Sequence, residues 1–576
     1  MANSEFEDLV LKHSLFNASQ HAGKANLGSI INKIIAEKSE LKSDIKNLMN
    51  EINPIVEKVN SMSLEEQIKL LQKDFPDMKP ETKHTEKFPL PSLPNFNSYE
   101  TIITRFSPNP NGHLHIGHVK ASRLDLRYAQ KYSGKLFLRF DDTNPVAIKD
   151  EFYNEILENL DWMGINPDQI TYASDYVDEI YKIAKEMFHD KHLYICECAP
   201  DAIKNNRFKK QICEHNLSDN SDKQFSDFLS TSINGVVRFR GDMKSDNTAM
   251  RDPVMLRFVK EEHTRTGKKY NIWPTYDLAA PITDCLEGVS HALRSKEFEL
   301  RDELYNEITQ ILYNQGKVKF RPSLVSFSRL SMKGSPTSKS NIKSLIDKGQ
   351  IDNWHDIRLV TLSALRKRGF IPEGISNFVD SLGLSKSESS PDFELLASFN
   401  RKARDKLDKR YFFVANPIKL KVSNIPVKSV TLKHHPTENL GDRTMSISNE
   451  LYVSPEDINP LNEGDEIRLM DLFNIKITNK SGTVMAECTG TEPVPSLKKI
   501  HWVAHDGINF NLLIPNNEKY RISSDDSFEF LPDSLTTLPG IAENQCKNLT
   551  EGDMLQFNRI GFCRVVSENS AILSHK

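Results

Sequence analysis

The stretch TRFSPNPNGHLHIGHVKA, Thr104–Ala121, decides the fold of this chain. A short strand, TIITRF, ends at two prolines and a glycine, and a helix begins near His115. A helix N-terminus stabilises an anion through its dipole and through backbone N–H groups that lack a partner. Gly117 would let a flat ligand lie against the backbone, because it has no Cβ. The stretch therefore predicts a nucleotide site at His115, Gly117 and His118. The alternative is a strand–turn–helix that only happens to carry histidines.

A second stretch, SFSRLSMKGSPTSKSNIKSLI at Ser326–Ile346, is rich in glycine, proline and serine and carries Lys333, Lys339 and Lys343. Such a loop is flexible and cationic and offers many hydroxyl donors, which suits the phosphate tail of ATP. Taken alone, the stretch favours a basic loop that only contacts solvent, so its interpretation depends on the first stretch.

Together the two stretches resemble the H-x-G-H and K-M-S-K-S motifs of class I aminoacyl-tRNA synthetases. The second motif is written PTSKS at Pro336–Ser340; its first lysine is missing, but the Ser-Lys-Ser core is present. From Arg105 to about Ala415 the chain resembles the glutamyl and glutaminyl branch of that class. Further matches to that branch occur in order: RFDDTNP (Arg139–Pro145), MRDPVMLR (Met250–Arg257), WPTYDLA (Trp273–Ala279), EGVSHALR (Glu287–Arg294) and LRKRGF (Leu365–Phe370).

The resemblance implies roles in ATP binding. Activation of an amino acid brings its carboxylate onto the α-phosphate of ATP while pyrophosphate leaves, so the protein positions the groups and supplies cations. The family roles place the imidazoles of His115 and His118 at the phosphates and make Lys339 the mobile catalytic cation, with Mg²⁺ accompanying the ATP. The implied ATP-binding residues are His115, Gly117, His118, Ser338, Lys339 and Ser340.

The same resemblance implies a pocket for glutamate. Arg105, Asp141 and Tyr276 correspond to residues beside the amino acid, and we assign Asp141 to the α-amino group, which needs an anionic acceptor. Arg294 decides the substrate, because glutamyl enzymes carry arginine there and glutaminyl enzymes typically an uncharged residue. A guanidinium offers only donors and the side-chain carboxylate of glutamate only acceptors, so the two are complementary. The alternative for each residue is a structural role.

Three cysteines and one histidine cluster in the peptides CEC (Cys196–Cys198) and CEH (Cys213–His215). Three thiolates and an imidazole complete a tetrahedral zinc shell, and some glutamyl enzymes carry the same C-x-C…C-x-H order. We therefore predict a structural zinc ion at Cys196, Cys198, Cys213 and His215. Free thiols beside a surface histidine are the alternative.

The composition predicts a cytoplasmic protein of several domains. The chain has 576 residues, and no apolar run approaches the roughly 20 residues that span a bilayer. Its start, MANSEFEDLVLKHS, does not read as a signal peptide, so we expect no membrane partner. Seven unevenly spaced cysteines favour a reducing cytosol. The net charge of −4 decides nothing, because tRNA binding needs a basic face rather than a basic total.

We predict four regions along the chain. The predicted fold class is therefore multidomain, with α/β and all-β parts. By resemblance, residues 1–95 form a helical N-terminal accessory domain and linker. Residues 96–345 alternate strand and helix patterns, as a Rossmann-like catalytic domain requires, with an acceptor-binding insertion at about 195–260. Residues 346–410 form a helical connecting domain. In residues 411–576 the pattern changes to period two, which indicates β-barrels; by resemblance they bind the anticodon.

In the first region, apolar residues recur every three or four positions, as in a helix with one buried face. Pro54 should begin or kink a helix, and Ser63–Glu66 reads as a capping box. The apolar stripe comprises Leu41, Ile45, Leu48, Ile52, Val56 and Val59.

In the β region, Trp502 and Arg443 are candidates for contact with the tRNA. An aromatic ring can stack on an unpaired base, and an arginine can pair with a base or a phosphate. For Trp502 we favour core packing over base contact.

We therefore expect an enzyme of the glutamyl-tRNA synthetase family, of the archaeal–eukaryotic type. It would form glutamyl-adenylate from L-glutamate and ATP and pass glutamate to the 2′-hydroxyl of the terminal adenosine of tRNA(Glu). The resemblance also allows tRNA(Gln) as a second substrate, and a monomer is the simplest expectation. One rival is a glutaminyl-tRNA synthetase, which Arg294 opposes. Another is a catalytically silent tRNA-binding paralogue, which only the incomplete PTSKS motif favours.

Overall fold

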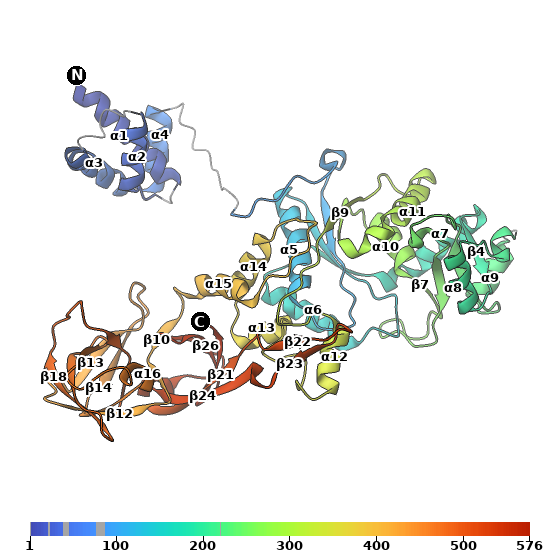
Figure 1. Cartoon of the computed structure of the whole chain (residues 1–576). Coiled ribbons are helices and arrows are strands. Elements are labelled where there is room, and N and C mark those ends of the chain that lie inside the picture. The colour runs from blue at the N-terminus through green and yellow to red at the C-terminus, as the bar shows by residue number, and fades with distance from the viewer. Residues whose placement is uncertain (1, 21–22, 38–44, 76–86, 219–220) are drawn as a thin grey trace. The chain divides into compact units, whose positions relative to one another are not determined.

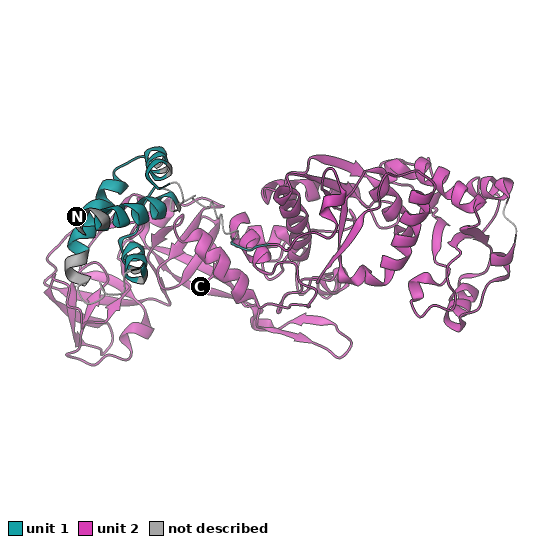
Figure 2. Ribbon diagram, turned by 90° about the horizontal axis from the view of Figure 1, so that it is seen from above, with its two compact units in different colours: residues 1–89 teal, residues 90–576 magenta. Residues whose placement is uncertain are grey.

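The computed structural model describes residues 2–20, 23–37, 45–75, 87–218 and 221–576. The chain forms two compact units, Met1–Pro89 (unit 1) and Leu90–Lys576 (unit 2), shown in Figure 2. None of the described helices is long and apolar enough to cross a membrane.

Unit 1 is a bundle of helices around one apolar core. The predicted stripe is confirmed at Ile52, Val56 and Val59, which are buried in that core. Leu41 and the side chains of Ile45 and Leu48 lie outside what the structure describes. Pro54 lies inside α3 (Ile45–Asn60), so it does not begin a helix; that it kinks the helix stays a prediction. The helix continues through Pro54, because Ile52 and Val56 on either side of it pack into the same core. The helices are α1 (Ala2–Gln20), α2 (Leu27–Glu37), α3 (Ile45–Asn60) and α4 (Leu64–Asp74).

Helix α4 begins at the predicted capping box. The Glu66 N–H donates to Ser63 Oγ at 3.3 Å, and the Ser63 N–H donates to the Glu66 carboxylate at 2.9 Å.

Unit 2 begins with a parallel sheet that confirms the predicted doubly wound catalytic domain. Strands β1, β2 and β3 pair in that order, and β8 pairs with β9. The Ser290 N–H donates to Ile103 O at 3.0 Å, which places β8 beside β1 and gives the order β3-β2-β1-β8-β9. The strands are β1 (Ile103–Phe106), β2 (Lys135–Phe140), β3 (Gln169–Tyr172), β8 (His291–Ser295) and β9 (Ser323–Phe327).

Helix α5, labelled in Figure 1, packs against β1, β2 and β8. Its apolar face is buried with the sheet in the largest core of unit 2, to which Ile116 and Val119 contribute. The helices of this domain are α5 (Ile116–Lys131), α6 (Asp150–Trp162), α10 (Tyr276–Leu286) and α11 (Asp302–Asn314).

Between β3 and β8 the chain forms a four-stranded antiparallel sheet with the order β4-β5-β6-β7. This is the region of the predicted insertion, and its last strand reaches Pro274, beyond the expected end near 260. Its elements are α7 (Val177–His189), β4 (Leu193–Cys196), α8 (Pro200–Lys209), α9 (Asp222–Leu229), β5 (Val236–Phe239), β6 (Val254–Phe258) and β7 (Ile272–Pro274).

After β9 the chain is helical up to Arg404, as predicted for the connecting region. The helices are α12 (Lys339–Asp347), α13 (Leu362–Arg368), α14 (Pro372–Ser381) and α15 (Phe393–Arg404).

The remaining chain forms two barrel-like, seven-stranded sheets and two hairpins, β13-β14 and β22-β23. One sheet has the order β19-β16-β17-β18-β12-β15-β20, and the other has the order β10-β25-β26-β27-β21-β24-β11. The chain thus starts in the second sheet, builds the first and returns. The elements are β10 (Lys409–Tyr411), β11 (Phe413–Ala415), β12 (Ile418–Ser423), β13 (Ser429–Lys433), β14 (Asp442–Ser446), β15 (Glu450–Val453), α16 (Pro455–Ile458), β16 (Glu466–Leu469), β17 (Asn474–Asn479), β18 (Val484–Gly490), β19 (Lys499–Ile500), β20 (Val503–Ala504), β21 (Ile508–Pro515), β22 (Tyr520–Ile522), β23 (Phe528–Phe530), β24 (Leu535–Ala542), β25 (Met554–Phe557), β26 (Gly561–Ser567) and β27 (Ser570–His575).

Both candidate tRNA contacts of the β region lie in the protein interior. Trp502 is fully buried, and its indole N–H donates to Met470 O at 2.9 Å, so the favoured core packing is confirmed. Arg443 is buried with its Nε 2.7 Å from the Glu543 carboxylate. The suggestion that Arg443 pairs with a base or a phosphate is therefore wrong, because the guanidinium neutralises a buried acid.

Candidate active site

A cavity of about 550 Å³ opens where strands β1 and β8 end. In the strand order, β2 and β3 lie on one side of β1, and β8 and β9 lie on its other side. The space between β1 and β8 is therefore the switch point, where doubly wound sheets bind ligands. The structure brings seven of the predicted site residues together in its lining. They are Arg105, His115, Gly117, His118, Asp141, Tyr276 and Arg294.

The two histidines cap helix α5 together. Nδ1 of His115 accepts the Gly117 N–H at 3.1 Å, and Nδ1 of His118 accepts the His115 N–H at 3.1 Å. Burial lowers the pKa of His118 to about 4 and that of His115 well below its ordinary value; the nearby Arg329 adds to both effects. Both imidazoles are therefore neutral at pH 7. Because each Nδ1 accepts a hydrogen bond, each proton is on Nε2, which can donate to a ligand.

The predicted unpaired N–H groups at the start of α5 are not found. The N–H groups of Ile116, Gly117 and His118 donate to Val360 O, His115 Nδ1 and His115 O. The expectation was wrong because the N-cap histidine satisfies donors that a Ser or Asp N-cap would take. An anion at this helix would therefore meet imidazole donors rather than backbone donors.

Gly117 lines the cavity, so its predicted contact with a flat ligand stays a prediction, and the structure gives a second reason for a glycine here. A Cβ at this position would lie 2.9 Å from the His115 ring and 3.4 Å from Leu330 O. The glycine therefore lets the His115 imidazole fold back over its own helix.

The Ser-Lys-Ser segment begins helix α12 and does not line the cavity. Ser338 is its N-cap, with Oγ accepting the Asn341 N–H at 3.2 Å, and Ser340 Oγ lies 3.3 Å from Ser338 Oγ. The Lys339 ammonium donates to Asn111 O, in the loop between β1 and α5. Burial, with Lys149 and Lys343 nearby, lowers the pKa of Lys339. The second motif thus contacts, through its lysine, the loop that precedes the H-x-G-H motif.

Arg105 belongs to a buried network of charges. Its guanidinium donates to both oxygens of Asp284, at 2.9 and 3.2 Å, and to Leu293 O at 2.9 Å. Arg139 lies 2.8 Å from Asp284 and 2.9 Å from Glu287. Burial alone would raise the pKa of Asp284, but the two guanidinium groups outweigh it and lower that pKa to about 2. Arg105 is thus held in place before any ligand binds.

Asp141 is the carboxyl group of this network that faces the cavity. Its Oδ1 lies 3.2 Å from Arg139 Nε, and its side chain is 18% exposed. Burial raises the pKa of Asp141 to about 6, although the guanidinium groups of Arg139 and Arg105 oppose that shift. At pH 7 it is mostly ionised and can accept from an ammonium group.

Arg294 is buried at the end of β8. One Nη pairs with Asp302, and the guanidinium carbon lies 4.7 Å from the centre of the Tyr305 ring. The other, Nη1, is buried and has no hydrogen-bond partner among the described residues. Buried donors are rarely left unsatisfied, so Nη1 of Arg294 indicates a ligand acceptor.

Tyr276, at the start of α10, packs its ring on Phe298 at 4.9 Å and lines the same cavity.

Sequence reasoning missed Arg329, Asp284 and Glu287 as site residues. Arg329 lines the cavity with its charge near both histidines, and its Nη1 lies 2.7 Å from Glu297. Arg329 stands inside the quoted stretch SFSRLS, so its position there was a usable signal. Asp284 binds Arg105 across 179 residues of chain, which no local pattern reveals.

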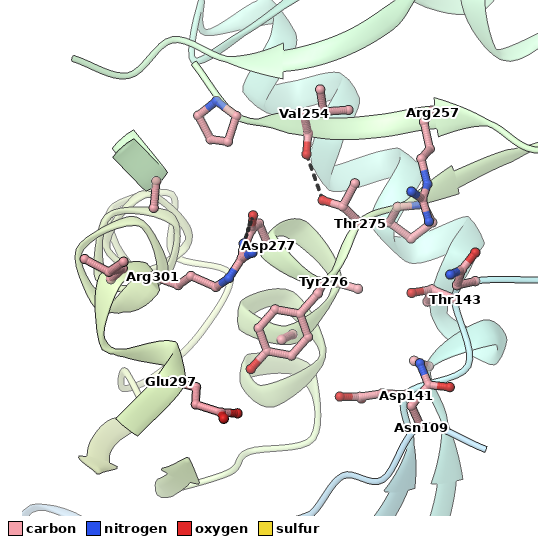
Figure 3. A pocket seen from close by; sticks show the side chains of 18 of the residues that line it. Asn109, Asp141, Thr143, Val254, Arg257, Thr275, Tyr276, Asp277, Glu297 and Arg301 are labelled. Carbon is pink, nitrogen blue, oxygen red and sulfur yellow. Dashed lines mark hydrogen bonds and ion pairs between the residues drawn. The ribbon is translucent and has the colours of Figure 1, made fainter. Parts of the chain in front are cut away.

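A second cavity, of about 560 Å³, adjoins the first, and the two share Asn109, Asp141, Tyr276 and Glu297 (Figure 3). It extends to the four-stranded insertion sheet. Three arginines line it: Arg207 on α8, Arg257 on β6, and Arg301, which pairs with Asp277. These cations suit a polyanionic chain that enters the first cavity from the insertion.

The four predicted zinc ligands lie together in the insertion. Their ligand atoms are all within 4.8 Å of one another, with Sγ–Sγ distances of 3.4 and 3.7 Å and Sγ–Nδ1 distances of 3.2 and 3.5 Å. With Zn–S bonds of about 2.3 Å, a tetrahedron has edges of about 3.8 Å, close to these values. Nη1 of Arg238 lies 3.7 Å from Cys196 Sγ, where it offsets the negative charge of a three-thiolate site. The cluster therefore fits zinc.

Comparison with known proteins agrees with this geometry. The family "tRNA synthetases class I (E and Q), catalytic domain" matches residues 101–407, and two anticodon-binding domains of the same group match residues 409–490 and 499–566. The glutamate–tRNA ligase of Nitrosopumilus maritimus is 39% identical over 100% of both chains. That of Pyrococcus furiosus is 36% identical over 99% of this chain and 100% of its own.

The chain therefore belongs to the class I tRNA synthetases for glutamate and glutamine and, with these relatives, to the glutamate–tRNA ligase family. Among solved structures, the glutamate–tRNA synthetase of Elizabethkingia anophelis aligns with 53% of this chain and 70% of its own at 19% identity, with a TM-score of 0.38.

Proposed function

We propose that the chain activates L-glutamate with ATP and transfers it to the 3′ end of tRNA(Glu). The observation that carries the choice of glutamate is Arg294, which lines the same cavity as His115 and His118 and whose buried Nη1 donor has no partner within the described part of the chain. The side-chain carboxylate of glutamate supplies the acceptor that this donor needs, whereas the amide N–H groups of glutamine would meet a group without acceptors.

ATP binds where the two motifs meet. The Nε2–H groups of His115 and His118 donate to phosphate oxygens. Both imidazoles are neutral, so the site does not bury two positive charges there. Lys339 supplies a cation from the Ser-Lys-Ser segment, with Ser338 and Ser340 beside it. Use of ATP with Mg²⁺ follows from the class I family, and the metal neutralises charge on the phosphates when bound.

Glutamate binds between β1 and β8. The Asp141 carboxylate accepts from the α-ammonium group, and Arg294 donates to the side-chain carboxylate. Arg105 and Tyr276 complete the pocket. In the first step an α-carboxylate oxygen of glutamate forms a bond to the α-phosphorus of ATP, and the bond to pyrophosphate breaks.

In the second step the 2′-hydroxyl of the terminal adenosine bonds to the activated carbonyl carbon, and AMP leaves. The tRNA end would approach through the second cavity, past Arg207, Arg257 and Arg301. We also propose that tRNA(Gln) is accepted, that the chain acts as a monomer in the cytoplasm, and that the predicted regions 1–95, 96–345, 346–410 and 411–576 are its domains.

We propose a structural zinc ion at Cys196, Cys198, Cys213 and His215. The cluster geometry and the adjacent Arg238 support it. The zinc would join β4 to the loop that follows α8 and hold the insertion rigid beside the second cavity.

ATP–pyrophosphate exchange in the presence of tRNA, with glutamate and glutamine compared, tests the activity. The proposal expects exchange that depends on glutamate. Exchange with glutamine alone would identify the glutaminyl enzyme, and no exchange with either would identify the silent paralogue.

A further inference from the structure

His263 is a buried histidine that the proposed mechanism does not use. It lies in the loop between β6 and β7, residues 259–271 (the β6–β7 loop), and is 2% exposed. Its Nδ1 accepts the N–H groups of Arg265 and Thr266 at 3.1 and 3.2 Å. The ring proton is therefore on Nε2, which donates to Asp142 O at 2.8 Å. Burial lowers the pKa of His263, which keeps the ring neutral at pH 7.

The β6–β7 loop holds the His263 ring in one direction. The ring stacks on the fully buried ring of Trp273 in β7, with ring centres 4.7 Å apart and planes at 15°. The backbones of His263 and Gly267 exchange two hydrogen bonds, of 3.2 and 2.8 Å, which close a tight turn. Gly267 has φ +58°, a conformation that favours glycine. The loop thus presents a fixed donor to Asp142.

Arg265 attaches the same loop to the chain that follows β3. Its Nη1 donates to Ser174 Oγ at 2.8 Å and to the Asp175 carboxylate at 3.0 Å. Its guanidinium carbon lies 3.5 Å from the centre of the Tyr172 ring. Ser174 in turn donates to the Asp142 carboxylate from its N–H and from its hydroxyl, each at 2.8 Å. The loop and the end of β3 therefore enclose Asp142 together.

Asp142 is fixed at both its side chain and its main chain. Its fully buried carboxylate also accepts the Tyr153 O–H at 2.9 Å, and its backbone O accepts from His263. The side chain of the preceding residue, Asp141, faces the cavity and accepts a long bond, of 3.2 Å, from Arg139 Nε. A carboxylate that must receive a ligand is aimed by its backbone, so the bonds on Asp142 decide where the Asp141 carboxylate lies.

We propose that His263 is a positioning residue, which holds the backbone of Asp142 so that the Asp141 carboxylate meets the α-ammonium group of glutamate. Only Asp141 touches the substrate, and His263 acts through it. This inference rests on the proposed function and deepens it, because it gives the insertion a part in the glutamate pocket. The alternative is that the β6–β7 loop only joins the insertion to the parallel sheet, which would affect folding but not glutamate in particular.

The test measures ATP–pyrophosphate exchange of the full chain, in the presence of tRNA, for the wild type and His263→Phe. The phenyl ring keeps the stack on Trp273 but cannot donate to Asp142 O. The KM for glutamate should rise about 5–10-fold, because a small displacement of a group that orients a substrate has a large effect. The KM for ATP should change less than about 2-fold, because Asp141 contacts only the amino acid in the proposed complex.

Rescue and coupling separate positioning from folding. His263→Gln keeps an N–H donor and should recover part of the lost glutamate affinity. In an Asp141→Asn background, adding His263→Phe should change kcat/KM for glutamate less than about 2-fold, because the carboxylate that His263 positions is already gone.

Lys268→Met is the matched control on the same loop. The Lys268 side chain is 80% exposed and pairs with the exposed Glu262 at 3.0 Å, so this variant should keep both KM values. If His263→Phe does not fold, Arg265→Met replaces it, because this change detaches the loop from the chain after β3 and leaves the His263 ring in place. It should also raise the KM for glutamate without raising that for ATP.

An unchanged KM for glutamate in the folded variant, an equal rise in the KM for ATP, or no recovery in His263→Gln would overturn the inference. So would independent, multiplicative effects of His263→Phe and Asp141→Asn. Each of these results leaves the proposed function standing, because wild-type exchange with glutamate tests that function separately.

Discussion

At the scale of single residues, we expect Asp141 to couple glutamate binding to pH. Its pKa is raised to about 6, and only the ionised carboxylate accepts from the α-ammonium group. We therefore expect kcat/KM for glutamate to be level above pH 7 and to fall about tenfold per pH unit well below 6. Asp141→Asn should lose most of the activity and also lose this acidic limb. If the fall in kcat/KM at acidic pH persists in the Asn variant, a group other than Asp141 causes it.

Arg294 is the residue on which, in our proposal, the choice of substrate depends. Arg294→Cys should lower kcat/KM for glutamate by a factor on the order of 10³ or more, because Asp302 and the ligand carboxylate would then face each other without a cation. Glutamine should gain at most a trace of activity. Arg294→Lys is the matched control: it keeps the charge but loses the planar fork, so it should recover only part of the loss. Unchanged glutamate kinetics in the Cys variant would contradict the assignment.

At the scale of elements, the zinc cluster predicts a metal content of one ion per chain. Elemental analysis of the purified protein should find one zinc, and Cys213→Ser should lose it, because three ligands hold the ion less tightly. Cys488→Ser, on β18 in the β region, is the control and should retain the metal. One zinc in both variants, or none in the wild type, would refute the site.

Local patterns predicted the elements better than they predicted the contacts between them. The strand–turn–helix at Thr104–Ala121 follows from its prolines, glycine and apolar spacing, and the structure confirms it. The capping of α5 by His115 was missed, since histidine is not among the usual N-cap residues. The pairing of β10 and β11 with strands more than 100 residues later was missed as well, because register between distant strands leaves no local signal.

The candidate site was predicted as a set of residues but not as a network of charges. Seven of those residues line one cavity. The sequence does not show that Arg105 is held by Asp284, because that contact joins parts of the chain that only the fold brings together.

At the scale of the whole molecule, the anticodon-binding region contacts the loop that leads into α12, the helix that begins at Lys339. Asn517, in the turn after β21, donates to Gly334 O at 3.2 Å and Arg358 O at 2.8 Å, and accepts from Arg368 at 2.6 Å. Gly334 has φ +76°, and a Cβ there would lie 1.8 Å from Asn517 O. Hairpin β22-β23 also packs Phe528 and Phe530 on α12, beside which it lies in Figure 1.

Asn517 should therefore support the position of Lys339 from a distance. Asn517→Ala leaves buried groups without partners, so we expect a loss of about 1–3 kcal/mol in stability and a lower kcat for charging. The adjacent Asn516 uses its side chain within its own turn, where Oδ1 accepts the Glu518 N–H at 3.0 Å, and its backbone N–H donates to Ser534 O at 2.8 Å, a bond that alanine keeps; Asn516→Ala should therefore change neither. Thermal unfolding and charging kinetics of the two variants check this. Equal effects would show that the turn, rather than the contact with the loop, matters.

Charging of tRNA(Glu) and tRNA(Gln) transcripts by the purified chain, with labelled glutamate and labelled glutamine in parallel, tests the central claim most directly. The account predicts glutamate on tRNA(Glu), no glutamine on either tRNA, and glutamate on tRNA(Gln) if the second substrate is accepted. Glutamine on tRNA(Gln), or no charging at all, would contradict it.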